Sequence, residues 1–210
     1  NGYDVVMVLS GGLYETDEFN SPKEFNKNYR KVNNLHLKFC DRLVANSNKK
    51  IIKLSSLNLD KKERELINKF NQIYNNSKNI EELIDLNLYG VKIHEHIFST
   101  YCRQTLTAPK NINDIDFERY KIIAVNVIKS IIYTNKILLK LKPSNTLATH
   151  GIYLNHGPLV DLCKKNNMSL TIWGIPYRKK TYFMTKGDTY HRALMHVEKK
   201  LWNVPLTDFE

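Results

Sequence analysis

The sequence has few cysteines and no pairing pattern among them, which argues against a fold held together by disulfide bonds. Only three cysteines occur in 210 residues, widely separated at Cys40, Cys102 and Cys163. An odd number of isolated cysteines is typical of proteins from a reducing compartment. No CxxC pair is present, so the sequence predicts no zinc site and we expect no bound metal ion.

Long hydrophobic runs and the signatures of several enzyme classes are also missing. No apolar run approaches the roughly 18 to 20 residues of a membrane-spanning helix, and no signal peptide is visible. The chain lacks the GxSxG elbow of many hydrolases and the HExxH motif of metalloproteases. It also lacks GxGxxG and GK[ST] loops, so nucleotide binding at its first loop is not indicated.

What the sequence does have is an excess of positive charge. The 32 Lys and Arg residues outnumber the 21 Asp and Glu residues, and the formal net charge is +11 at pH 7. Such an excess favours anionic partners such as nucleic acid, acidic lipid, phosphate or acidic sugar. Coding bias towards Lys and Asn explains it equally well. Against nucleic acid stands the absence of an RNP motif, a KH loop and an Arg-dense recognition helix.

The length and hydrophobic content fit one globular domain. With 210 residues, of which 42% are hydrophobic, the chain can bury a substantial core. No linker or repeat divides it, so we expect a single domain over residues 1–210. The first residue is not Met, and we expect the chain to be a fragment of a longer protein.

One stretch of the chain has the pattern of a strand, a helix and a second strand. Short apolar runs at residues 146–149 and 169–173 flank a helical run that ends near Lys165. This spacing is typical of a βαβ unit and implies a parallel sheet. A further buried strand is predicted over residues 4–9. We expect these three strands in one sheet of an α/β fold, with their carboxyl ends at one edge.

Periodic apolar patterns predict helices between the first strand and the βαβ unit. These cover residues 21–45, 61–74, 80–86, 88–106 and 114–141, with a short strand at residues 51–54. We expect them to form a helical insertion in which the longest helix is largely buried. His94 and His96 lie about 200° apart on one helix and cannot share a metal ion. The simplest interpretation places both on the helix surface, and the alternative that one faces a cleft stays open.

Polar residues at the predicted strand ends are candidates for a shared site, because ligands of open parallel sheets gather outside the carboxyl ends of the strands. The candidates for a general base are His150 and His191, since imidazole exchanges a proton near neutral pH. The candidate substrate-binding residues are Gly11, Gly12, Gly151, His156, Arg178, Asp188, Tyr190 and Arg192.

Local chemistry supports these candidates. The Gly pair after the first strand exposes backbone N–H groups, and Gly151 lets a ligand approach the backbone closely. His156 begins a helix whose dipole favours an anion. Arg178 and Arg192 can form forked hydrogen bonds to carboxylate or phosphate. An ordinary structural role is the alternative for each candidate, and for Asp188 we expect one: its carboxylate should cap the helix that follows.

Two stretches around these residues carry a family resemblance. They read THGIYLNHGP (residues 149–158) and IWGIPYRKKTYFMTKGDTYHR (residues 172–192). Both resemble the N-terminal half of bacterial capsule and surface-polysaccharide biosynthesis proteins, which look like two-domain glycosyltransferases of the GT-B type. The resemblance covers about residues 146–200. It implies a Rossmann-like, acceptor-side N-terminal domain, and it matches polar positions of the family to His150, Arg178, Asp188 and His191.

The resemblance implies transfer of a sugar from a nucleotide-sugar donor to a saccharide or lipid-linked acceptor. A base would activate the acceptor hydroxyl, with His150 as the first candidate and His191 as the second. No cofactor is expected here, because the donor would bind a C-terminal domain outside this chain, which alone should be inactive. We expect a cytoplasmic enzyme, with peripheral association at the inner membrane face left open. The alternative is a non-catalytic anion- or nucleic-acid-binding α/β domain.

Overall fold

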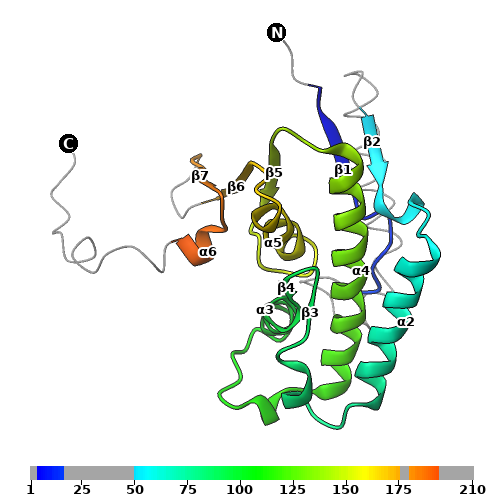
Figure 1. The fold of residues 1–210 in the computed structure, drawn as a ribbon. Coiled ribbons are helices and arrows are strands. Elements are labelled where there is room, and N and C mark those ends of the chain that lie inside the picture. Colours follow the sequence, from blue (N-terminus) through cyan, green and yellow to red (C-terminus); the bar gives the residue numbers. More distant parts are fainter. Residues whose placement is uncertain (1–3, 17–49, 176–179, 194–210) are drawn as a thin grey trace, which may run out of the picture.

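The first strand of the chain forms a small parallel sheet of its own. A computed structural model describes residues 4–16, 50–175 and 180–193 (Figure 1). Strand β1 (Val6–Leu9) pairs in parallel with β2 (Lys50–Lys53), with Val6 opposite Lys50 and Leu9 opposite Lys53. Both strands were predicted from their apolar runs. The helix predicted over residues 21–45 lies outside the described residues.

A second sheet contains the predicted βαβ unit. Strands β5 (Thr146–Thr149) and β6 (Leu170–Gly174) are parallel, and helix α5 (Gly157–Lys165) connects them. This confirms the strand, helix and strand pattern read from the sequence. Strand β7 (Phe183–Lys186) runs antiparallel on the other side of β6 and was not predicted.

The mixed α/β class is confirmed, but the expected single parallel sheet of β1, β5 and β6 is wrong. In the described part of the chain, β1 pairs with β2, and β5, β6 and β7 form a separate sheet. An apolar run indicates that a strand is buried but does not specify which backbone edge it pairs with. The Rossmann-like form of the fold therefore stays a prediction.

The helix predicted over residues 88–106 begins with a hairpin instead. Strands β3 (Asn87–Leu88) and β4 (Val91–Lys92) pair in antiparallel fashion around Tyr89 and Gly90, whose φ angles are 53° and 79°. Positive φ at both central residues is the geometry that two-residue hairpins prefer. Helix α3 (Ile93–Thr105) follows directly. The helix predicted over residues 80–86 is only a 3₁₀ turn, η2 (Glu81–Leu83).

Two long helices match their predictions and begin at acidic caps. Helix α2 (Lys61–Asn76) starts at Asp60 in a capping box with Glu63. Helix α4 (Phe117–Leu141) starts at Asp116, whose side chain accepts a hydrogen bond from a backbone N–H of the first turn. Two further 3₁₀ turns precede these helices, η1 (Leu54–Ser56) and η3 (Ile112–Asp114).

Helix α4 forms the centre of the core. It packs against α2 on one side and against α3 and α5 on the other (Figure 1). Its buried residues include Tyr120, Ile123, Ala124, Val127, Ile128, Ile131 and Ile132. Among the described helices, α4 alone has the length and apolar composition of a membrane span, but 61% of its most apolar window is buried inside the protein. Most of that window therefore packs against other parts of the protein.

Within the described part of the chain, one face of the β5–β6–β7 sheet is packed against the core. Ala148, Leu170 and Ile172 point to the covered face and are buried in the core. On the opposite face, Trp173 of β6 lies next to Met184 of β7, and both side chains are exposed. The carboxyl ends of β5 and β6 and the segment after β7 then carry the polar residues that the sequence singled out.

Candidate functional site

The turn after β5 places His150 at the carboxyl end of that strand. His150 has a φ of 56°, which is uncommon for a residue with a side chain, and Gly151 has a φ of 81°. A Cβ on Gly151 would lie 2.8 Å from Cγ2 of Val160 and 2.9 Å from Cβ of Thr189. Gly151 is therefore needed for tight packing of the turn, and this role requires no ligand.

Helix α6 (Tyr190–Ala193) brings two more candidate residues to His150. The hydroxyl of Tyr190 lies 2.6 Å from Nδ1 of His150. The ring centroid of His191 lies 6.4 Å from that of His150 and 4.1 Å from that of Tyr190. Tyr153, in the loop before α5, lies 5.9 Å from His150 by the same measure. We call these four residues, His150, Tyr153, Tyr190 and His191, the ring cluster.

The ring cluster borders a pocket of about 430 Å³. The pocket is lined by Phe98, Ser99, Cys102 and Arg103 of α3, by Ile152 and Tyr153, and by His191. Nε2 of His191 is buried, and none of the described residues forms a hydrogen bond with it. Buried polar atoms in proteins are nearly always paired, so this unpaired nitrogen, in a residue that lines the pocket, calls for an explanation.

Both imidazoles of the ring cluster are held in the neutral form near pH 7. Burial lowers the pKa of His150 below its ordinary value, and the positive charge of Arg103 lowers it further. Burial also lowers the pKa of His191, and His150 adds to the effect. Burial raises the pKa of the Tyr190 phenol, which therefore keeps its proton. A neutral imidazole has a lone pair that can accept a proton, as a general base must.

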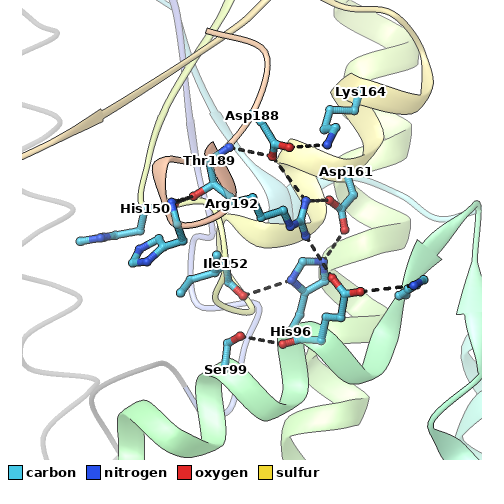
Figure 2. Close-up of polar contacts among 12 residues, drawn as sticks. His96, Ser99, His150, Ile152, Asp161, Lys164, Asp188, Thr189 and Arg192 are labelled. Atoms are coloured by element: carbon cyan, nitrogen blue, oxygen red, sulfur yellow. Dashed lines mark hydrogen bonds and ion pairs between the residues drawn. The ribbon is translucent and has the colours of Figure 1, made fainter. Parts of the chain in front are cut away.

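Next to the ring cluster lies a partly buried group of ion pairs and hydrogen bonds, which we call the charged network: Glu95, His96, Asp161, Asp188 and Arg192. Figure 2 shows His96, Asp161, Asp188 and Arg192 together with His150. His96 of α3 is only 1% exposed. Its Nδ1 lies 3.1 Å from the backbone oxygen of Ile152, and its Nε2 lies 2.8 Å from Oδ2 of Asp161 on α5. Both partners are hydrogen-bond acceptors. His96 thus ties α3 to α5 and to the loop that carries Tyr153.

The expectation that both histidines of the HEH segment lie on the helix surface is wrong. His96 is buried in the charged network, and His94 is half-buried with its Nδ1 2.8 Å from the hydroxyl of Tyr120. The sequence gives the angle between the His94 and His96 side chains around the helix. It does not show that His94 faces α4 and that His96 faces α5.

Arg192 completes the charged network by joining three elements. Its Nη1 donates to Oδ1 of Asp161 at 2.7 Å and lies 3.4 Å from Asp188, and its Nη2 lies 3.2 Å from Glu95 of α3. Burial alone would raise the pKa of Asp161, but the hydrogen bonds and charges of His96 and Arg192 lower it by more. Burial likewise opposes the charge of Arg192, and its acidic partners outweigh that effect and raise its pKa. Arg192 is therefore committed to internal ion pairs.

The start of α6 is capped by Thr189 and not by Asp188. The backbone N–H of His191 donates to the Thr189 hydroxyl at 3.4 Å, and that hydroxyl donates to the backbone oxygen of His150. Asp188 accepts instead from the backbone N–H of Thr189 at 2.7 Å and forms an ion pair with Lys164 of α5. Thr189 is fully buried, and its hydroxyl links the backbone of His150 to the backbone of His191.

His156 and its neighbour Gly157 serve the packing of α5. A Cβ on Gly157 would lie 2.2 Å from Nδ1 of His96, so the glycine leaves room for the buried imidazole. Burial lowers the pKa of His156 to about 4, with a smaller effect from His150. His156 is therefore neutral near pH 7, and its side chain makes no capping hydrogen bond to α5. The binding role expected for His156 stays a prediction.

Gly11 and Gly12 lie in the turn after β1, and Gly11 contacts η1. Their φ angles are 65° and 83°. A Cβ on Gly11 would lie 2.5 Å from Oγ of Ser55, and the Ser55 hydroxyl donates to the backbone oxygen of Gly11 at 2.8 Å. The contacts of Gly11 give it a structural role beside β2. Arg178 lies outside the described residues.

The structure adds residues to the site that sequence reasoning missed. Tyr153 lies in the THGIYLNHGP stretch, three residues after His150, so that stretch was a signal for it. Arg103 had no comparable signal, because it belongs to a helix far from the ring cluster in the sequence. The same holds for Asp161, which reads as an ordinary polar residue of α5.

Hydrogen bonding and proton transfer are the chemistry that this arrangement supports most directly. Among the described residues, no group of three or more His, Cys, Asp or Glu side chains is placed to hold a metal ion. Comparison with protein-family models, with curated proteins and with solved structures finds no match to this chain.

Proposed function

We propose that the pocket beside the ring cluster is the acceptor site of a glycosyltransferase of bacterial surface-polysaccharide biosynthesis. The observation that carries the proposal is His191, which lines the pocket and has a lowered pKa, and whose Nε2 is buried without a hydrogen-bond partner among the described residues. An acceptor hydroxyl is a partner that this atom can use, because it donates a hydrogen bond and then its proton. The resemblance of about residues 146–200 to capsule biosynthesis proteins supports the same class of reaction.

In the proposed reaction, His191 acts as the general base. The acceptor hydroxyl donates to Nε2 and loses its proton to that nitrogen as its oxygen attacks the anomeric carbon of the donor sugar. The bond from that carbon to the diphosphate breaks, and the nucleoside diphosphate leaves. His150 is the second candidate for the base, because its Nδ1 is already occupied by Tyr190. The nucleotide sugar would bind a further domain of the complete protein, at the cytoplasmic face of the inner membrane.

The experiment follows nucleoside diphosphate release by the complete product of the gene, with a panel of nucleotide sugars and acceptor saccharides. Loss of a general base typically lowers a rate by about 10²- to 10⁴-fold, so we expect a loss of that order for His191→Gln. A smaller loss is expected for His150→Gln. The matched control is His94→Gln, which removes a half-buried histidine that does not line this pocket.

Two outcomes would contradict this proposal. Full turnover in both His191→Gln and His150→Gln would remove the base from the ring cluster. Saccharide binding by the complete protein without any transfer would instead favour the non-catalytic binding domain. We further propose that residues 1–210 alone bind the acceptor without turnover, which chemical-shift changes of the His191 imidazole on addition of a saccharide would detect.

A further inference from the structure

A second pocket lies beside the first histidine of the HEH segment, and we call it the loop pocket. It is lined by His94 and Phe98 of α3 and, from the segment that joins α3 to α4, by Pro109, Lys110, Asn111, Ile112 and Ile115. Of these residues, Phe98 alone also lines the pocket beside the ring cluster. The loop pocket fits the alternative, left open by the sequence, that one histidine of this segment faces a cleft.

The hydrogen bond to Tyr120 leaves the imidazole of His94 with a donor. Tyr120 is 0% exposed, and burial raises the pKa of its phenol, so the hydroxyl keeps its proton. A buried O–H group needs an acceptor, and among the described residues this hydroxyl is bonded to Nδ1 of His94 alone, at 2.8 Å. Burial lowers the pKa of His94 against an opposing effect of Glu95, so the ring is neutral near pH 7. A neutral imidazole that accepts at Nδ1 carries its proton on Nε2.

The polar groups of the loop pocket are mainly hydrogen-bond donors. Nε2 of His94 has no hydrogen-bond partner among the described residues. Lys110 is exposed and forms no ion pair within the described part of the chain. The side chain of Asn111 accepts from the backbone N–H of Asp114, which leaves its amide N–H groups as donors. Asp114 accepts in turn from the backbone N–H of Asn111 at 3.2 Å, and no Asp or Glu is among the described residues that line the pocket.

The remaining walls of the loop pocket are apolar, and the pocket is small. Phe98, Pro109, Ile112 and Ile115 form these walls, and Ile115 is buried. The volume of the pocket is about 210 Å³. Because a water molecule takes about 30 Å³ in the liquid, a ligand of roughly seven non-hydrogen atoms fits. A nucleotide or a disaccharide is too large for this space.

We infer that the loop pocket binds a small carboxylate with a short aliphatic stem. The carboxylate oxygens accept hydrogen bonds from Nε2 of His94 and from the ammonium group of Lys110. The stem lies against Phe98 and the two isoleucines, where it is removed from water. Phosphate offers similar oxygens but has no stem to cover the apolar walls. This inference goes beyond the proposed function and does not rest on it, because the ring cluster takes no part.

Binding of four probes to residues 1–210 tests the inference. They are 3-methylbutanoate, its neutral counterpart 3-methylbutanamide, acetate and inorganic phosphate, each followed by calorimetry and by the His94 imidazole signals in NMR spectra. Hydrogen bonds to a charged group correspond to about ten- to hundredfold in affinity, so we expect the acid to bind that much more tightly than the amide. Acetate has the same charge but a shorter stem, and it should bind about tenfold more weakly than 3-methylbutanoate.

Two variants separate the charged contact from the apolar one. Lys110→Met should lower the affinity for 3-methylbutanoate about tenfold and leave the weaker binding of the amide unchanged. Ile112→Ala should weaken the binding of both. The matched control is Lys69→Met on α2, which removes the same charge from an exposed residue that does not line the loop pocket. Circular dichroism checks that the folds are equal, and the nitrogen chemical shifts of His94 report which ring nitrogen carries the proton.

Several results would overturn the carboxylate site. Equal affinity for the acid and the amide, or equal losses in Lys110→Met and Lys69→Met, would remove the charged contact. Tighter binding of inorganic phosphate than of 3-methylbutanoate would show that the apolar walls hold no stem. A proton on Nδ1 of His94, or no binding of any probe, would remove the site altogether. None of these results bears on the proposed function, which fails if turnover by the complete protein is independent of the ring cluster.

Discussion

Removal of the Arg192 guanidinium provides a sharp test of the charged network next to the ring cluster. Arg192→Met keeps the length of the side chain but leaves Asp161 with His96 as its remaining partner in the network. The side chain of Asp161 is 14% exposed and that of Arg192 is 28% exposed, so the pair lies between the buried and the surface cases. Breaking a fully buried pair costs about 3–5 kcal/mol, whereas surface pairs contribute about 0.2–1 kcal/mol.

We therefore expect Arg192→Met to lower the free energy of unfolding by about 2 kcal/mol, between these limits. For a chain of this size, that loss lowers the melting temperature by about 4–8 °C. The assay is urea unfolding followed by circular dichroism, with thermal unfolding as a second measure. The matched control is Lys164→Met, which removes a 43% exposed partner of Asp188 and should cost less than about 1 kcal/mol.

A double-mutant cycle shows whether the loss comes from the pair itself. Arg192→Met and Asp161→Asn should couple by about 1–2 kcal/mol, because each removes the interaction that the other would break. Additive losses, or equal losses in Arg192→Met and Lys164→Met, would refute the view that this network binds α6 to α5. In the proposed enzyme, Arg192→Met should also lower turnover, because α6 carries Tyr190 and His191.

Three further substitutions test other parts of the site. Gly157→Ala places a Cβ 2.2 Å from Nδ1 of His96 and should cost about 1–3 kcal/mol in urea unfolding, and wild-type stability would contradict the packing role of Gly157. Burial lowers the pKa of His156 to about 4, so the unfolded chain takes up a proton on this residue first as the pH falls, and the free energy of unfolding declines between about pH 6.5 and pH 4. His156→Phe should reduce this decline in urea unfolding at several pH values. An unchanged pH profile in the variant would show that His156 does not cause the decline. Tyr190→Phe removes the hydroxyl that is hydrogen-bonded to His150 but keeps the ring, so we expect the free energy of unfolding to fall by about 1 kcal/mol. The imidazole signals of His150 in NMR spectra should shift as well. Unchanged signals would show that this hydrogen bond does not form in solution.

Elements with local signals were predictable from the sequence, and the pairing of strands was not. The apolar period of α2 and α4 and the acidic caps at Asp60 and Asp116 are properties of adjacent residues. The strand, helix and strand order around α5 is likewise local. The separation of β1 from β5, and the addition of β7 beside β6, depend on contacts between distant backbone edges, which an apolar run does not encode.

The candidate site divides in the same way. Two stretches near the end of the sequence supplied His150, Tyr190 and His191, and the structure brings their rings within 6.4 Å of one another by centroid. The opposite wall of the pocket comes from α3, where Arg103 was indistinguishable from a solvated surface residue. The burial of His96 could not be predicted either, because it depends on the docking of α5 and on the missing side chain of Gly157.

The central position of α4 has a consequence for the order in which the chain folds. Helix α3 precedes α4 by a short connection and α5 follows it closely, so these helices can meet after closing short loops. The pairing of β1 with β2 joins residues 44 positions apart in sequence, and the Gly11 turn is bonded to Ser55 over the same separation. Local contacts form sooner than distant ones, because less loop-closure entropy is lost. We therefore expect a helical nucleus around α4 to form first, and the β1–β2 sheet to dock onto it late.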